Sequence, residues 1–159
     1  MANNRDRIWD YEWDTICGKW HKQRIVTYAD RKTWYLLAKK LKNVIWLAWE
    51  LTISSRELFT MIPIEKKHTI TDDNWFEFVD HEEFTRQTGI TVYFANKYRP
   101  RERWTNEYTN WLVRQFLPKG YDFDTVTDWQ LEEIVEIINT RPRKKLWRKT
   151  PKEVFWWES

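Results

Sequence analysis

Glycine is scarce in this chain, which has only 3 glycines among 159 residues but 13 tryptophans. An average glycine usage of about 7% would give roughly 11. Glycine is the usual residue wherever φ must be positive, so a chain with so few glycines has difficulty forming tight turns. The shortage of one residue and the excess of the other suggest a common cause.

Cysteine and long apolar segments are also nearly absent. Cys17 is the only cysteine, so no internal disulfide can form, which suits a reducing cytosol. The longest apolar stretch, residues 44–53, contains Glu50 and is too short to span a bilayer. The N-terminus is polar and charged, unlike a secretory signal. We therefore expect a cytoplasmic protein without a membrane partner.

The length and net charge of the chain are compatible with a nucleic-acid partner. A chain of 159 residues suits one domain with a real hydrophobic core. The net charge of +3 and the isoelectric point near 8.9 are compatible with binding nucleic acid, but they are too modest to argue for it alone.

The order of periodic segments predicts an α/β fold. We expect strands at 9–16, 24–28 and 34–38, which short connections make antiparallel neighbours. A helix from a cap at Asn43 to Phe59 leads to a strand at 68–71, a helix at 81–88 and a strand at 90–94. Helices at 105–116 and 128–139 follow, the second capped by Thr127. This order predicts a mixed sheet of three antiparallel strands followed by parallel strands, flanked by helices, and it matches the ribonuclease H-like fold.

Three acidic residues fall where this fold can bring them together. Asp14 lies in the first strand, Asp73 follows the 68–71 strand, and Glu107 lies in the 105–116 helix. Taken alone, Asp73 reads as a turn residue and Glu107 as a solvated helix residue. Strand ends at one edge of a sheet converge on the crevice there, and hard divalent cations prefer oxygen ligands. Together the three carboxylates predict a site for two Mg²⁺ or Mn²⁺ ions that promote phosphoryl transfer.

Basic and polar residues surround this candidate site and predict contacts with DNA phosphates. Residues 141–152 hold seven Lys or Arg and no acid, so we divide the chain into a catalytic core at 1–140 and a basic C-terminal tail at 141–159. The residues expected to contact DNA are Arg99, Arg101, Arg103, Asn110, Arg114, Arg141, Arg143, Lys144, Lys145, Arg148 and Lys149.

Several ordered motifs resemble a known family. The chain is similar, over residues 7–159, to the catalytic (DDE) domain of bacterial insertion-sequence transposases of the IS-thirty type, within the retroviral-integrase-like group. The interval of thirty-three residues between Asp73 and Glu107 is the family's own. The matching stretches are residues 9–16, 30–33, 73–78, 105–112, 139–144 and 149–151.

The resemblance implies that Asp14, Asp73 and Glu107 are the catalytic and metal-binding triad of a DNA transposase. It implies cleavage and strand transfer on double-stranded DNA, both element ends and target, by a homo-oligomer in the nucleoid of a bacterial cytoplasm. From the resemblance we also expect the chain to lack the family's N-terminal helix-turn-helix region, which binds the terminal repeats. The alternative is a truncated, inactive remnant that only binds DNA or assembles with full-length copies.

Tryptophan stands repeatedly where the family pattern has glycine. We hypothesise that the gene comes from a genome that reads the UGA codon as glycine, and that it was translated with a code that reads UGA as tryptophan. An alternative is a stacking platform for single-stranded DNA, which aromatic rings among cations can provide. The positions concerned are Trp9, Trp13, Trp20, Trp75, Trp104, Trp111 and Trp147, with Trp157 as a further candidate, while the pattern leaves Trp34, Trp46, Trp49, Trp129 and Trp156 undecided.

Overall fold

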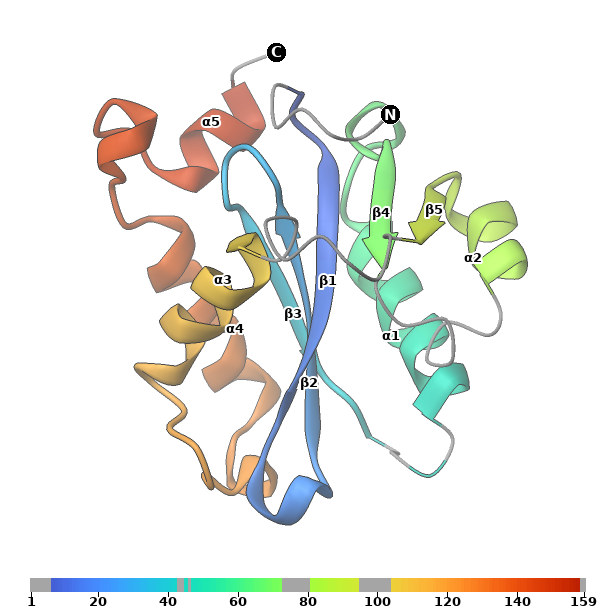
Figure 1. Cartoon of the computed structure of the whole chain (residues 1–159), viewed down its shortest axis with the longest axis vertical. Helices are drawn as coiled ribbons and strands as arrows, with labels where there is room; N and C mark the ends of the chain where they lie inside the picture. The colour runs from blue at the N-terminus through green and yellow to red at the C-terminus, as the bar shows by residue number, and fades with distance from the viewer. Residues whose placement is uncertain (1–6, 43–44, 46, 73–80, 95–103, 158–159) are drawn as a thin grey trace.

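A five-stranded mixed sheet forms the centre of the computed structural model, which describes residues 7–42, 45, 47–72, 81–94 and 104–157 (Figure 1). The strand order is β3-β2-β1-β4-β5. The first three strands are antiparallel neighbours, and β4 and β5 run parallel to β1, which confirms the expected fold class. The strands are β1 (Asp10–Cys17), β2 (Arg24–Asp30), β3 (Leu36–Lys40), β4 (Thr69–Asp72) and β5 (Thr91–Phe94).

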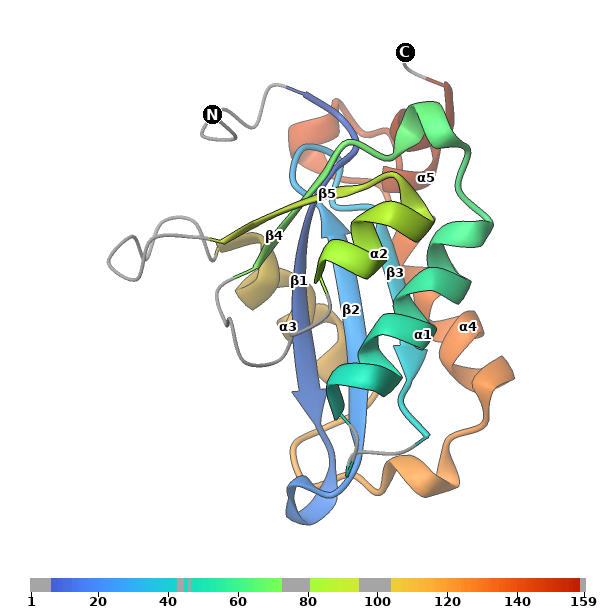
Figure 2. The same ribbon diagram turned by 90° about the vertical axis from the view of Figure 1, so that its right-hand side faces the viewer.

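Helices cover both faces of this sheet. In Figures 1 and 2, α1 and α2 lie on one side of the sheet, and α3 and α4 lie on the other. The helix α5 lies near the end of the sheet where β1 begins (Figure 1). The helices are α1 (Leu47–Thr60), α2 (His81–Thr88), α3 (Trp104–Arg114), α4 (Asp128–Asn139) and α5 (Pro151–Trp157).

The alternation of side chains along β1 gives the sheet two different faces. Tyr11 and Trp13 are buried in the core cluster that includes Leu51 and Phe59 of α1. Ile16 is buried in the second cluster, with Leu112 of α3 and residues of α4. The acids of β1, at positions 10, 12 and 14, alternate with the α1-facing residues, so they lie on the side of the sheet where α3 packs.

Most expected elements are found, with shifted ends. Helix α4 has the expected bounds, and its N-terminus is a capping box in which Thr127 and Gln130 satisfy each other's backbone N–H groups. The third strand begins at Leu36 rather than residue 34, because Asp30 accepts hydrogen bonds from the turn that follows it and Trp34 has φ +59°. The cap expected at Asn43 lies outside the described residues.

The basic stretch after residue 140 includes a helix that the sequence reading missed. Phe155 of α5 is fully buried, and its ring stacks on that of Tyr35 with centroids 4.2 Å apart. Val154 is also buried, against Trp34 and Leu146. Part of this stretch therefore contributes to the core, and the boundary at residue 140 stays a prediction based on composition. Within the described residues, no helix has the length and apolarity that crossing a membrane requires.

Candidate active site

Asp14 lies in the middle of β1, opposite Thr27 of β2. Its side chain is partly buried and restrained by two hydrogen bonds. The backbone N–H of Thr15 donates to Oδ1 at 2.8 Å, and Nδ2 of Asn110 donates to Oδ2 at 2.6 Å. The carboxylate is therefore oriented toward α3 by the protein itself.

Polar side chains at every fourth position of α3 attach this helix to β1. Besides Asn110, Nδ2 of Asn106 donates to the carbonyl of Trp13 at 2.9 Å, and the guanidinium of Arg114 donates to the carbonyl of Cys17 at 2.7 Å. Residues four apart lie on one face of a helix, so the three contacts follow one line along the strand. Helix α3 therefore has a fixed position relative to Asp14.

Glu107 lies on the same helix and is exposed to solvent. It follows Asn106 directly and precedes Asn110 by three residues, so it lies within one helical turn of the two amides that bind β1. The structure thus places the helix that carries Glu107 directly against the strand that carries Asp14.

Asp73 lies outside the described residues, so its position stays a prediction. The strand that leads to it is described: β4 pairs in parallel with β1, with Thr71 opposite Glu12, and ends at Asp72. Within the described ranges, no group of three or more His, Cys, Asp or Glu side chains is placed to hold a metal ion.

The donor atoms around Asp14 fit a hard divalent cation. Asp14 supplies carboxylate oxygens, and Oδ1 of Asn110 is a buried oxygen with no hydrogen-bond partner among the described residues. Glu107 adds an exposed carboxylate on the adjacent helix. Oxygen ligands of this kind are those that Mg²⁺ and Mn²⁺ prefer.

The residues expected to contact DNA fall into three groups. Arg99, Arg101 and Arg103 lie outside the described residues. Asn110 and Arg114 hold β1 against α3, as described above. The third group follows α4, and its members are Arg141, Arg143, Lys144, Lys145, Arg148 and Lys149.

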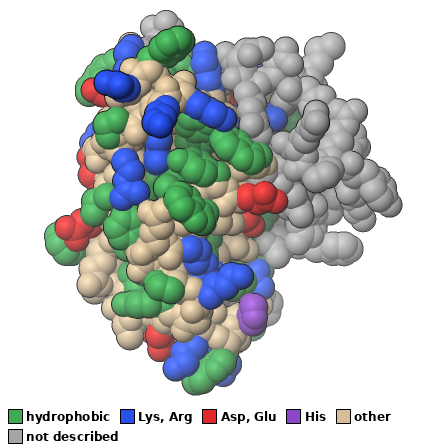
Figure 3. All heavy atoms as spheres, turned by 60° about the vertical axis from the view of Figure 1, so that its left-hand side comes forward, with side chains coloured by type: hydrophobic (Ala, Val, Ile, Leu, Met, Phe, Trp, Pro, Cys, Tyr) green, Lys and Arg blue, Asp and Glu red, His purple; other side chains and the backbone are tan. Residues whose placement is uncertain are grey.

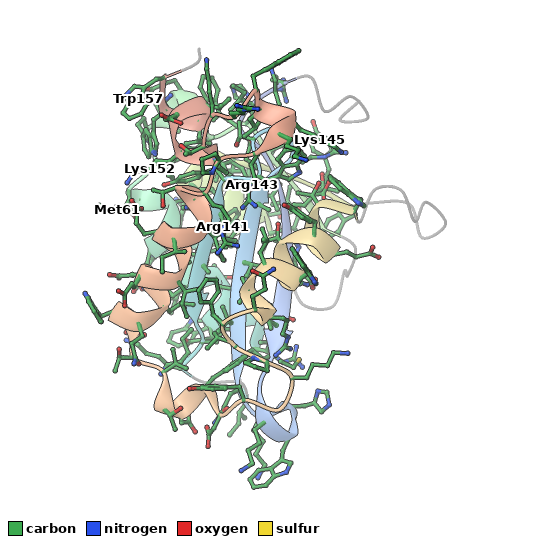
Figure 4. The ribbon with its side chains drawn as sticks, turned by 90° about the vertical axis from the view of Figure 1, so that its left-hand side faces the viewer. Met61, Arg141, Arg143, Lys145, Lys152 and Trp157 are labelled. Carbon is green, nitrogen blue, oxygen red and sulfur yellow. The ribbon has the colours of Figure 1, made fainter. Side chains whose placement is uncertain are left out.

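Arg143 differs from the rest of the third group because it is buried. Its guanidinium donates to the hydroxyl of Tyr108 and to the carbonyl of Ile138, both at 3.1 Å. Burial lowers the pKa of Arg143 from its ordinary value. Figure 4 shows Arg143 inside the structure, beside the sheet. The contacts that the structure shows for Arg143 therefore join α3 to the end of α4.

The other cations of this group are accessible on the surface. Lys144, Lys145, Arg148 and Lys149 are exposed, and Arg141 donates to Oε1 of Gln115 at 3.1 Å. Nζ of Lys145 lies 4.4 Å from the ring centroid of Trp104, at the start of α3. Figure 3 shows Lys and Arg side chains among hydrophobic ones on this side of the molecule. A positively charged surface thus borders the helix that carries Glu107.

Two buried polar groups that hold the adjoining ends of β2 and β3 were missed by the sequence reading. Asn139, at the end of α4, exchanges hydrogen bonds of 2.8 and 2.9 Å with the backbone of Leu36. Asp30, at the end of β2, is fully buried and accepts hydrogen bonds from the turn that follows. Both lie in stretches that the family motifs cover, at 30–33 and 139–144, which is the only signal that could have found them.

Comparisons with known proteins agree with this geometry. No family model matches the chain. It is 42% identical over 153 residues to the transposase for insertion sequence element IS4351 of Bacteroides fragilis, covering 95% of this chain and 45% of that protein. It is 34% identical to the transposase InsI for element IS30A of Escherichia coli, covering 96% of this chain and 39% of that protein. The chain thus spans less than half the length of these relatives.

Solved structures show the same fold. The catalytic core domain of BIV integrase matches with a TM-score of 0.69 at 19% identity, covering 92% of each chain. A chain of the simian T-cell lymphotropic virus intasome matches with a TM-score of 0.73 at 17% identity, covering 92% of this chain and 54% of that one. At these identities the likeness establishes the fold alone.

Proposed function

We propose that this chain, which belongs to the IS30 family of insertion-sequence transposases, is the part of such an enzyme that cuts and joins DNA strands. The observation that carries the proposal is the contact between Asp14 and Asn110. It sets a half-buried carboxylate of the central strand against the helix that carries Glu107. This pairing occurs on a chain that is 42% identical to a transposase.

Asp14, Asp73 and Glu107 are the proposed ligands of two Mg²⁺ or Mn²⁺ ions. Such ions lower the pKa of an attacking water or 3′-hydroxyl and stabilise the leaving oxygen of an in-line displacement. The contribution of the chain itself is orientation. The bond from Asn110 leaves the carboxylate of Asp14 fewer rotamers to lose when a ligand binds. The hydrogen bonds from Asn106 and Arg114 to β1 likewise fix the position of the α3 backbone before a ligand binds.

Double-stranded DNA, as element end and as target, is the proposed substrate. The exposed cations after α4 are placed to bind phosphates, and such contacts position DNA without specifying its sequence. The buried Arg143 supports this surface by holding the segment that follows α4 against Tyr108 of α3 and the end of α4. We further propose that the protein acts as a homo-oligomer in the bacterial cytoplasm, as a strand-transfer reaction on paired DNA ends requires.

The test is Mg²⁺-dependent strand transfer from a pre-cut oligonucleotide end into a target plasmid. We expect joined product with the chain as given, and a loss of about a thousandfold or more with Asp14→Asn. The matched control is Asp128→Asn, which removes the charge of an exposed acid in the first turn of α4 and should leave the rate nearly unchanged. Equal rates for the unmodified chain and Asp14→Asn, or DNA binding without any joined product, would instead support the inactive remnant.

A further inference from the structure

Tryptophan occupies an unusual share of the left-handed backbone positions in this protein. Among the described residues, six that are not glycine have positive φ, and four of them are tryptophan. A bulky residue with positive φ is a genuine outlier, because its Cβ approaches the neighbouring carbonyl oxygen. Gly89 and Gly120 show the same conformation at +76° and +80°. The four tryptophans are Trp9 (+72°), Trp20 (+54°), Trp34 (+59°) and Trp147 (+53°).

Two of these tryptophans gain little burial in return for the strained backbone. Trp20 lies in the turn between β1 and β2 and is 74% exposed, and Trp147 is 91% exposed. Trp147 ends the short 3-10 helix Lys144–Leu146 in a left-handed conformation. Glycine is the residue most often found where a helix ends in this conformation.

Trp34 is unfavourable for a second reason: its side chain is buried, but its indole N–H is not paired with an acceptor in the described part of the chain. It is 8% exposed, and its indole Nε1 has no hydrogen-bond partner among the described residues. A buried indole N–H normally finds an acceptor, and leaving it unpaired is unfavourable. The backbone N–H of Trp34 donates to the carbonyl of Asp30 at 2.9 Å, a bond that glycine would keep.

At Trp9, too, the short hydrogen bond is made by the backbone and not by the side chain. Its N–H donates to Oδ2 of the buried Asp30 at 2.5 Å. Its indole N–H donates a long hydrogen bond, 3.4 Å, to the carbonyl of Phe155. At both Trp9 and Trp34, the short contact with Asp30 is one that any residue with a backbone N–H provides, and glycine provides it without strain.

We infer that glycine stands at positions 9, 20, 34 and 147 in the protein that the host cell makes, and that these codons are UGA, read as glycine by that host. One codon reassignment accounts at once for 3 glycines, 13 tryptophans and the left-handed backbone at these four places. The left-handed backbone at these positions is independent of the family pattern, and it includes Trp34, which that pattern left undecided. It does not depend on the proposed function.

A consequence for the active-site face follows from Trp34. Its ring lies against the rings of Trp104 and Tyr108 of α3, with centroids 5.8 and 6.1 Å away. Glycine at position 34 would remove one side of this aromatic cluster, on the helix that carries Glu107. With glycine at position 34, the surface next to the proposed site would lack the indole ring that covers it when tryptophan is present.

The first experiment reads the four codons and the mass of the tryptic peptide at residues 33–39 in protein isolated from the host. This peptide contains Trp34 as its only tryptophan. We expect UGA at the four codons and a peptide mass that corresponds to glycine at position 34. UGG codons, or a mass that corresponds to tryptophan, would overturn the inference.

The second experiment tests the backbone argument on recombinant chains. Trp147→Gly and Trp20→Gly, at two exposed positions, should each raise Tm, by roughly 2–4 °C, because glycine relieves a left-handed residue without removing a buried side chain. Trp129→Gly is the matched control. Trp129 is also exposed, at 66%, but lies in the first turn of the helix α4, where glycine relieves no left-handed backbone and lowers the helix propensity, so Tm should fall. A fall in Tm for all three variants would contradict the backbone argument.

Discussion

Asp30 of β2 and Asp14 of β1 are held by the protein in two opposite ways. Asp30, at the end of β2, is fully buried and accepts hydrogen bonds from N–H of Trp9, N–H of Thr33 and the hydroxyl of Thr33, at 2.5 to 2.7 Å. Asp14 is half-buried, accepts one backbone and one amide hydrogen bond, and faces α3. Asp30 closes a turn, whereas Asp14 keeps capacity for a ligand.

The other two acids of β1 resemble Asp30 rather than Asp14. Glu12 and Arg31 form an ion pair of 3.0 Å in which both side chains are buried. Asp10 accepts a hydrogen bond of 2.7 Å from the hydroxyl of Thr69 on β4, and it is also paired with Arg7. These contacts join β1 to the β2–β3 turn and to β4. The buried acids with short intramolecular contacts hold the fold together, whereas the less enclosed Asp14 is the acid that we propose as a metal ligand.

The largest effect on stability should come from Arg31→Met, which removes the cation that Oε1 of Glu12 binds. Breaking one partner of a buried ion pair costs about 3–5 kcal/mol, because it leaves a buried charge uncompensated. Urea unfolding followed by tryptophan fluorescence measures the loss. The double variant Glu12→Gln with Arg31→Met should recover part of it, and a loss below about 1 kcal/mol would show that the pair does not hold the turn.

Asp30 should make stability depend on pH. Burial raises the pKa of Asp30 to about 6, although the hydrogen bonds from Thr33, Trp9 and Lys32 act in the opposite direction. The folded state therefore binds the proton more tightly than the unfolded chain, in which an aspartate titrates near its ordinary pKa of 3.8. This contribution is fully present below pH about 4 and is lost as the pH rises to about 6.

The expected loss between pH about 4 and 6 is at most about 3 kcal/mol, since one pKa unit corresponds to about 1.4 kcal/mol. The Asp30→Asn side chain cannot ionise, so the free energy of unfolding of this variant should not decrease between pH about 4 and 6 through this residue. Urea unfolding of both proteins at several pH values gives the difference between the two curves. A difference that stays constant from pH about 4 to 7 would show that Asp30 does not titrate in this range.

Asn110→Ala should affect activity more than stability, because it removes the amide that orients Asp14. Loss of such a supporting contact typically costs about 10–100-fold in metal affinity or activity. The rate of Mg²⁺-dependent strand transfer measures it. Gln115→Ala, which removes the exposed acceptor of Arg141 just after α3, is the control and should leave the rate nearly unchanged. Equal rates for both variants would contradict the orienting role.

The smallest effect should come from Lys152→Ala. Lys152 pairs with Glu136 at 2.6 Å, but both side chains are well exposed. Figure 4 shows it on the far side of Arg141 and Arg143 from Lys145. Exposed ion pairs contribute about 0–1 kcal/mol, so urea unfolding should show almost no change. A loss as large as that of Arg31→Met would remove the distinction between buried and exposed pairs.

The sequence predicts the sheet and the main helices well, because strands and helices leave clear periodicities in it. It could not give the role of Asn110, since an amide on a polar helix reads as a DNA contact until the helix is placed against β1. The sequence also could not predict that Arg143 is buried or that helix α5 forms, because both lie in the basic stretch after residue 140. A basic stretch reads as solvated, although Phe155 within it is fully buried.

The most direct test of the account is a calorimetric titration of Mn²⁺ into the full chain and three variants. Asp14→Asn and Glu107→Gln should each weaken Mn²⁺ binding about tenfold or more, because each removes an oxygen of a proposed ligand. Asp30→Asn, in the enclosed acid, should bind Mn²⁺ as the unmodified chain does. Unchanged affinity in Asp14→Asn, or weakened binding only in Asp30→Asn, would contradict the assignment of Asp14 as the acid that holds the metal.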